Sequence, residues 1–67
     1  MLSIKINGKL EEIDESMSAL ELLRSKNIKK ETVVFMLNDK IIKREELNKY
    51  KIKQNDEIEI LRFVSGG

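Results

Sequence analysis

The chain has 67 residues, 13 of them basic and 12 acidic, and it contains neither histidine nor cysteine. The absence of these two residue types excludes a disulfide framework, the common zinc sites, thiol nucleophiles and histidine-based acid–base catalysis. A formal net charge of +1, with two phenylalanines and one tyrosine as the aromatic residues, gives no reason to expect nucleic acid or an anionic membrane as a partner.

The N-terminal segment predicts a β-hairpin. Residues Leu2–Ile6 alternate apolar and polar side chains, which is typical of a half-buried β-strand. Asn7-Gly8 follows, and this pair is a strong hairpin signal because both residues tolerate a positive φ angle. Residues Lys9–Ile13 are therefore expected to form the returning strand.

A short helix is predicted after the hairpin, over residues 19–26. Ser18 and Glu21 have the spacing of a capping box, in which the serine side chain caps the first turn and the glutamate reaches back to the serine backbone. Leucine and alanine side chains supply an apolar face. So short a helix is marginal alone, and we expect it to pack against a sheet.

The second half of the chain predicts three more strands. Thr32–Leu37 is apolar and β-branched, Ile41-Ile42 starts a short strand, and Glu57–Phe63 is the last strand. The polar segment Lys43–Tyr50 is expected to be irregular, with one helical turn at Glu45–Leu47. The order β-β-α-β-β-β predicts an α+β fold of the β-grasp, or ubiquitin-like, type. In this fold one main helix covers one face of a mixed sheet of four to five strands.

The two-residue period of a strand assigns side chains to the two faces of this sheet. Ile58, Ile60, Val33, Phe35 and Leu37 would face the helix. The remaining apolar side chains of the third and last strands would gather on the open face if those strands are neighbours: Val34, Met36, Leu61 and Phe63. An exposed apolar patch on a small protein suggests a partner surface. Strands that are apolar on both faces, or a loop over the patch, would explain the same pattern.

The chain ends Phe63-Val64-Ser65-Gly66-Gly67, directly after the last predicted strand. Glycine is costly to order and adds no packing, so residues 64–67 are expected to form a narrow, flexible tail on a single domain of residues 1–67. The terminal carboxylate could then enter the active site of another protein. A frayed end is the alternative, since chain termini often fray, but the strand before the tail favours the functional interpretation.

Five segments of the chain match a known family: Leu2–Ile6, Glu21–Leu23, Leu37–Glu45, Asp56–Ile60 and Phe63–Gly67. Over essentially its whole length the sequence resembles the ThiS family, the ubiquitin-like sulfur carriers of bacterial thiamine biosynthesis. The terminal Gly-Gly is the specific element of this resemblance. The chain departs from the family's common pattern at Lys43, where proline is usual, and at Asn55, where glycine is usual.

The resemblance implies a carrier and not an enzyme. A ThiF-type adenylating enzyme would use ATP to join AMP to the Gly67 carboxylate, and sulfur from a cysteine desulfurase, passed as a persulfide, would replace the AMP. The Gly67 thiocarboxylate would then give its sulfur to a ThiG-type thiazole synthase, and Gly66 would keep the tail narrow. The residues expected to contact the partners are Val34, Met36, Leu61, Phe63, Val64 and Ser65. The chain itself would bind no cofactor and no metal.

The same tail chemistry leaves other roles open. The sulfur could serve molybdopterin or amino-acid biosynthesis, or the acyl adenylate could lead to isopeptide bonds, as in a ubiquitin-like protein modifier. A non-covalent interaction module with an incidental Gly-Gly is a further alternative. The short length and the single short helix favour the thiamine carrier. With no apolar run long enough to cross a bilayer and no signal-peptide layout, we expect a soluble, cytoplasmic protein that is monomeric when free.

Overall fold

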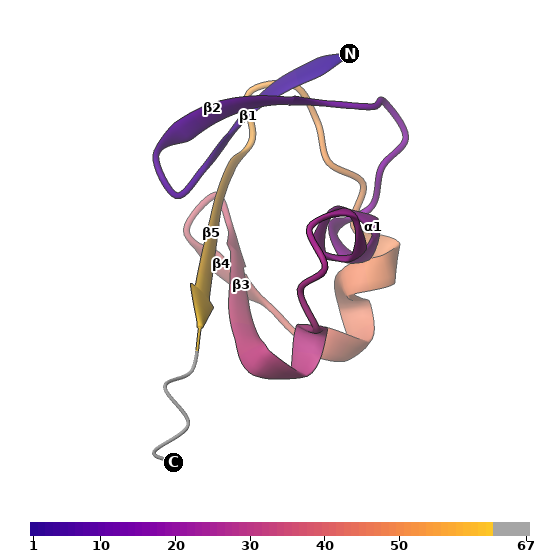
Figure 1. Ribbon diagram of the computed structural model, residues 1–67, viewed down its shortest axis with the longest axis vertical. Helices are drawn as coiled ribbons and strands as arrows, with labels where there is room; N and C mark the ends of the chain where they lie inside the picture. The colour runs from indigo at the N-terminus through magenta and orange to yellow at the C-terminus, as the bar shows by residue number, and fades with distance from the viewer. Residues whose placement is uncertain (63–67) are drawn as a thin grey trace.

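The computed structural model describes residues 1–62 as a five-stranded mixed sheet with one α-helix packed on one face (Figure 1). The strands are β1 (Leu2–Ile6), β2 (Lys9–Ile13), β3 (Val33–Leu37), β4 (Lys40–Ile42) and β5 (Glu57–Arg62). The helical segments are α1 (Ala19–Ser25) and two 3₁₀ helices, η1 (Lys30–Thr32) and η2 (Arg44–Lys49). This arrangement confirms the predicted β-grasp fold.

The last strand of the chain lies at the centre of the sheet. The strand order is β2-β1-β5-β3-β4, and β5 pairs in parallel with β1 and antiparallel with β3. The antiparallel register places Phe35 opposite Ile60 and Val34 opposite Leu61. The strand that leads to the C-terminal residues therefore has a neighbour on each side.

The capping box predicted for the helix is present. The Ser18 hydroxyl accepts a hydrogen bond from the Glu21 amide at 3.1 Å, and the Glu21 carboxylate accepts one from the Ser18 amide at 2.9 Å. The pKa of the Glu21 carboxyl lies below its usual value, chiefly because of the hydrogen bond from the Ser18 backbone and, to a lesser extent, because of the one with the Ser18 side chain. The α-helix ends at Ser25, and Asn27 adopts a φ of 59° in the turn that follows.

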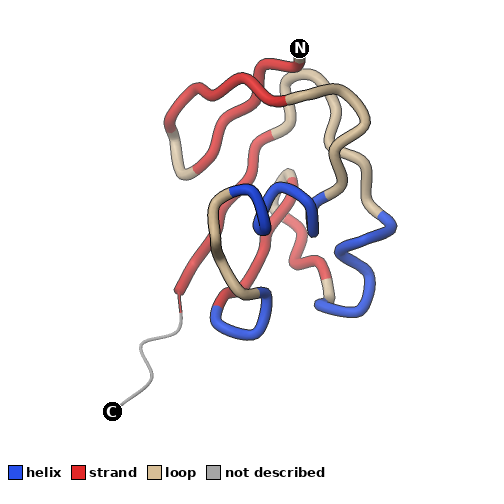
Figure 2. Tube along the Cα trace, turned by 45° about the vertical axis from the view of Figure 1, so that its right-hand side comes forward, coloured by secondary structure: helices blue, strands red, loops and turns tan. Residues whose placement is uncertain are grey.

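A single hydrophobic cluster fills the space between the sheet and the helical segments. Its buried members are Ile4, Ile6, Ile13, Ala19, Leu22, Leu23, Val33, Phe35, Ile42, Leu47, Ile52, Ile58 and Ile60. The segments α1 and η2 lie on the same side of the sheet and together cover this cluster (Figure 2). Leu37 is half-buried and packs against the cluster, as its predicted face requires.

One local feature is longer than predicted, and another explains a departure from the family pattern. The helical turn expected at Glu45–Leu47 is a longer 3₁₀ helix, η2, because the side chain of Leu47 is 1% exposed and ties the segment to the core. Asn55 has a φ of 69°, and asparagine tolerates this left-handed geometry. The turn before β5 therefore forms without the glycine that is usual in the family.

Candidate functional site

The face of the sheet opposite α1 carries apolar side chains of β3 and β5. Residues directly opposite each other in paired strands point to the same side of a sheet. Phe35 and Ile60 form such a pair and are 2% and 8% exposed, on the side of the helix. Their neighbours Val34 and Leu61 form the next pair and lie on the open face, where Leu61 is 49% exposed. The predicted faces of these residues are confirmed.

Two further apolar residues extend this surface toward the edge strand β4. Met36 lies on the open face of β3 and pairs with Ile41 of β4, which is 68% exposed. The patch predicted from the sequence did not include Ile41. The two-residue period of a strand offered a signal for it: its neighbour Ile42 points into the core, so Ile41 must point to the open face. We call Val34, Met36, Ile41 and Leu61 the open-face patch.

The remaining predicted site residues fall outside the part of the chain that the structure describes. These residues are Phe63, Val64, Ser65, Gly66 and Gly67.

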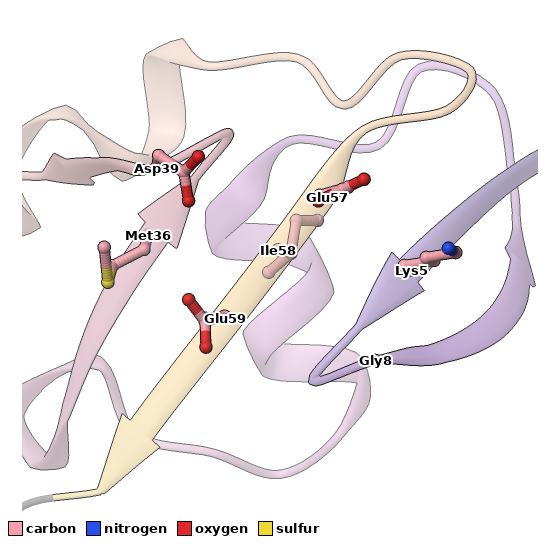
Figure 3. Close-up of a pocket in the computed structure, with 7 residues that line it drawn as sticks. All are labelled: Lys5, Gly8, Met36, Asp39, Glu57, Ile58 and Glu59. Carbon is pink, nitrogen blue, oxygen red and sulfur yellow. The ribbon is translucent and has the colours of Figure 1, made fainter.

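A shallow acidic depression adjoins the patch (Figure 3). It has a volume of about 230 Å³ and is lined by Lys5, Gly8, Met36, Asp39, Glu57, Ile58 and Glu59. Glu57 and Glu59 extend from β5, and Met36 of β3 faces Glu59 across the strand pair (Figure 3). Three carboxylates against one lysine give this part of the face a negative charge. The open face thus combines an apolar area with an acidic one.

The apolar patch beside an acidic depression is the kind of surface that binds another protein. Within residues 1–62, no group of three or more acidic side chains is placed to hold a metal ion, and every buried side-chain nitrogen or oxygen atom has a hydrogen-bond partner. No helix in the same range is long and apolar enough to cross a membrane. A partner that complements the face would present apolar side chains beside basic ones.

Comparisons with known proteins identify the family. The model of the ThiS family matches residues 4–67. A crystal structure of a thiamine biosynthesis protein (ThiS) from Geobacter metallireducens is 32% identical and superposes with a TM-score of 0.85, covering 98% of this chain and 100% of that chain. A solution NMR structure of a thiamine biosynthesis protein from the same organism is also 32% identical, with a TM-score of 0.81, and the match covers 98% of this chain and 88% of that one. No curated protein sequence was found to match. Because the family model spans nearly the whole length, the chain belongs to the ThiS family.

Proposed function

We propose that the protein carries sulfur as a thiocarboxylate on Gly67 and delivers it for the formation of the thiamine thiazole. Membership of the ThiS family supports a sulfur carrier role. The observation that carries the proposal is the extent of the family match, which runs to residue 67 and so includes the terminal Gly66-Gly67. Two solved structures that share 32% of their residues with this chain are described as thiamine biosynthesis proteins, which supports thiamine as the destination of the sulfur.

The chemistry begins with activation of the terminal carboxylate, which is a poor electrophile. An oxygen of the Gly67 carboxylate attacks the α-phosphorus of ATP, pyrophosphate leaves, and an acyl adenylate forms. The terminal sulfur of a persulfide then attacks the acyl carbon and releases AMP. Reduction of the resulting acyl disulfide by a thiol leaves the thiocarboxylate. The carrier supplies no acid, base or metal to these steps, and the partner enzymes supply them.

The Gly-Gly end suits this chemistry for steric reasons. The activating enzyme must bring the carboxylate to the α-phosphate, and positioning supplies much of such a rate enhancement. A side chain at Gly66 or Gly67 would widen the segment that enters the active site and restrict its backbone. We therefore assign residues 64–67 as a narrow tail on the β-grasp domain, with Gly67 as the attachment point.

The open face supplies the docking surface in this proposal. The open-face patch meets apolar side chains of a ThiF-type adenylating enzyme in the first step and of a ThiG-type thiazole synthase in the last. Glu57, Glu59 and Asp39 lie beside it and meet basic groups of these enzymes. Charges at the edge of an interface contribute chiefly to the rate and orientation of encounter. Using one face for both partners makes the two complexes mutually exclusive, so the loaded carrier leaves the first enzyme before it meets the second.

Intact mass spectrometry tests the proposal directly. The protein is incubated with a ThiF-type enzyme, ATP, a cysteine desulfurase, cysteine and a reducing thiol, and a chain that lacks Gly67 is treated in parallel. We expect a mass gain equal to the replacement of one oxygen atom by one sulfur atom in the full chain and no gain in the truncated one. An unchanged mass of the full chain, with an enzyme set that loads another ThiS protein, would refute the proposal. Adducts on lysine side chains would indicate a protein modifier.

A further inference from the structure

The parallel pairing between β1 and β5 stops before β5 ends. The two strands pair only through Lys5 with Glu57 and Ile6 with Ile58. The chain then turns away at Asn7-Gly8, and Gly8 lies beside β5 in Figure 3. Ile60 is the next residue of β5 whose backbone faces the β1 side. It is 8% exposed, and a buried peptide group without a hydrogen-bond partner is strongly unfavourable.

The side chain of Asn7 takes the place of the missing strand residue. Its amide nitrogen donates to the Ile60 carbonyl oxygen at 3.3 Å, and its amide oxygen accepts from the Ile60 N–H at 2.8 Å. The Asn7 backbone N–H donates to the Ile58 carbonyl oxygen at 2.9 Å. A side-chain amide presents the same donor and acceptor as a peptide group. Asn7 thus continues the β1–β5 ladder by one step while its own backbone, at a φ of 51°, is already in the turn.

We propose that Asn7 is a positioning residue that fixes the point at which the C-terminal segment leaves the sheet. The inference rests on the proposed function, because a fixed point of departure matters only if Gly67 must be placed in an active site. Asn7 holds Ile60, the residue directly before Leu61 of the open-face patch. Without the side-chain amide, residues 60–62 of β5 keep their pairing only with β3 among the elements that the structure describes. The activating enzyme would then receive a tail whose base is no longer held on both sides.

Asn38 provides a matched control at the opposite end of the same strand. It also lies in a turn with a φ of 51°. Its amide oxygen accepts from the Glu57 N–H at 2.9 Å, and its amide nitrogen donates to the Asp56 carboxylate at 3.0 Å. Glycine at either position keeps the left-handed turn and removes two side-chain hydrogen bonds to the β5 region. Asn7→Gly and Asn38→Gly should therefore lower the free energy of unfolding by similar amounts. Only Asn7→Gly removes hydrogen bonds at the end of β5 that leads to the C-terminal residues.

The test measures adenylation kinetics and amide hydrogen exchange on the full chain. Pyrophosphate release by a ThiF-type enzyme, followed as a function of carrier concentration, gives kcat and KM for each carrier variant. Exchange of the Ile60 amide in the free carrier reports whether its bond to Asn7 is lost, and the Glu57 amide reports the same for Asn38. Asn7→Asp is a third variant. It keeps the turn and the acceptor for the Ile60 N–H but cannot donate to the Ile60 carbonyl.

In the Asn7→Gly variant we expect the Ile60 amide hydrogen to exchange about fivefold faster than in the wild type, because that amide has lost one hydrogen bond. Its kcat should be about tenfold lower, because the alignment of the carboxylate is disturbed, and its KM should stay within about twofold since the open-face patch is intact. Asn7→Asp should lower kcat by less. Asn38→Gly should speed exchange at Glu57 and leave kcat unchanged.

Two results would overturn this inference while leaving the proposed function intact. Equal kcat values for Asn7→Gly and Asn38→Gly, with an active wild type, would show that the Asn7 amide only stabilises the sheet. An unchanged exchange rate at Ile60 in Asn7→Gly would show that the hydrogen bonds are not formed in solution. An inactive wild-type chain, with an enzyme that adenylates another ThiS protein, would instead refute the proposed function and this inference with it.

Discussion

The substitution Leu61→Asp tests whether the open face is a docking surface. Complete burial of a leucine side chain is worth about 1.5–3 kcal/mol. Leu61 is 49% exposed in the free chain, so about 1 kcal/mol remains to be gained when a partner covers it. An aspartate forfeits this gain and places a third carboxylate on the face of β5 that already carries Glu57 and Glu59. We therefore expect a total loss of about 2 kcal/mol, or about 30-fold in affinity.

Binding to a ThiF-type enzyme, measured by titration calorimetry, checks this value, and urea unfolding measures the accompanying loss of stability. That loss should be about 1 kcal/mol, since only half of the side chain is buried in the free chain. The matched control is Leu10→Asp. Leu10 is 74% exposed and pairs with Lys5 on the same face, but it lies on the edge strand β2, away from the open-face patch. Equal affinities for the two variants would refute the open-face assignment, and so would a global unfolding of the Leu61→Asp chain.

Two further predictions concern stability. Because the pKa of Glu21 is depressed in the folded state, its ionised form stabilises the fold above the unfolded-state pKa, and this contribution is lost as the pH falls through the folded-state value. Glu21→Gln should therefore lower the free energy of unfolding at neutral pH, and this difference should disappear in acid once the carboxyl is protonated in the folded state as well. A stability difference that persists there would contradict the capping-box assignment. Leu47→Ala should cost about 2–5 kcal/mol in urea unfolding because its side chain is 1% exposed. A loss below about 1 kcal/mol would mean that η2 does not anchor the core.

The elements of this fold could be predicted where local chemistry determines them. The Asn7-Gly8 turn, the capping box at Ser18 and the alternation of β5 each depend on residues within a few positions of one another. The faces of β3 and β5 also followed from the two-residue period, and Leu61 was placed correctly on that basis. Ile41 was missed because the short strand around it was predicted without an assignment of its faces.

The features that could not be predicted depend on contacts between distant parts of the chain. Asn7 signals a turn in the sequence, but its bonds to Ile60 join residues 53 positions apart. The parallel pairing of β1 with β5 has no local signal, since parallel strands are connected through distant segments. The length of η2 depends on burial of Leu47 in the core cluster, and a polar segment alone predicts only an irregular loop.

The position of β5 lets so small a chain hold a stable core and, in the proposed function, offer the residues after this strand to a partner. A chain of about 60 residues buries a limited fraction of its surface, and this one has no disulfide and no histidine or cysteine with which to bind a structural metal. β5 contributes both to the core and to the open face because its side chains alternate. Ile58 and Ile60 lie in the core, whereas Glu59 and Leu61 line the open face. A C-terminal strand at the edge of the sheet would have one neighbour only, and force on the tail could separate it from the sheet. At the centre, the strand that leads to the tail cannot be withdrawn without breaking its pairing with both β1 and β3.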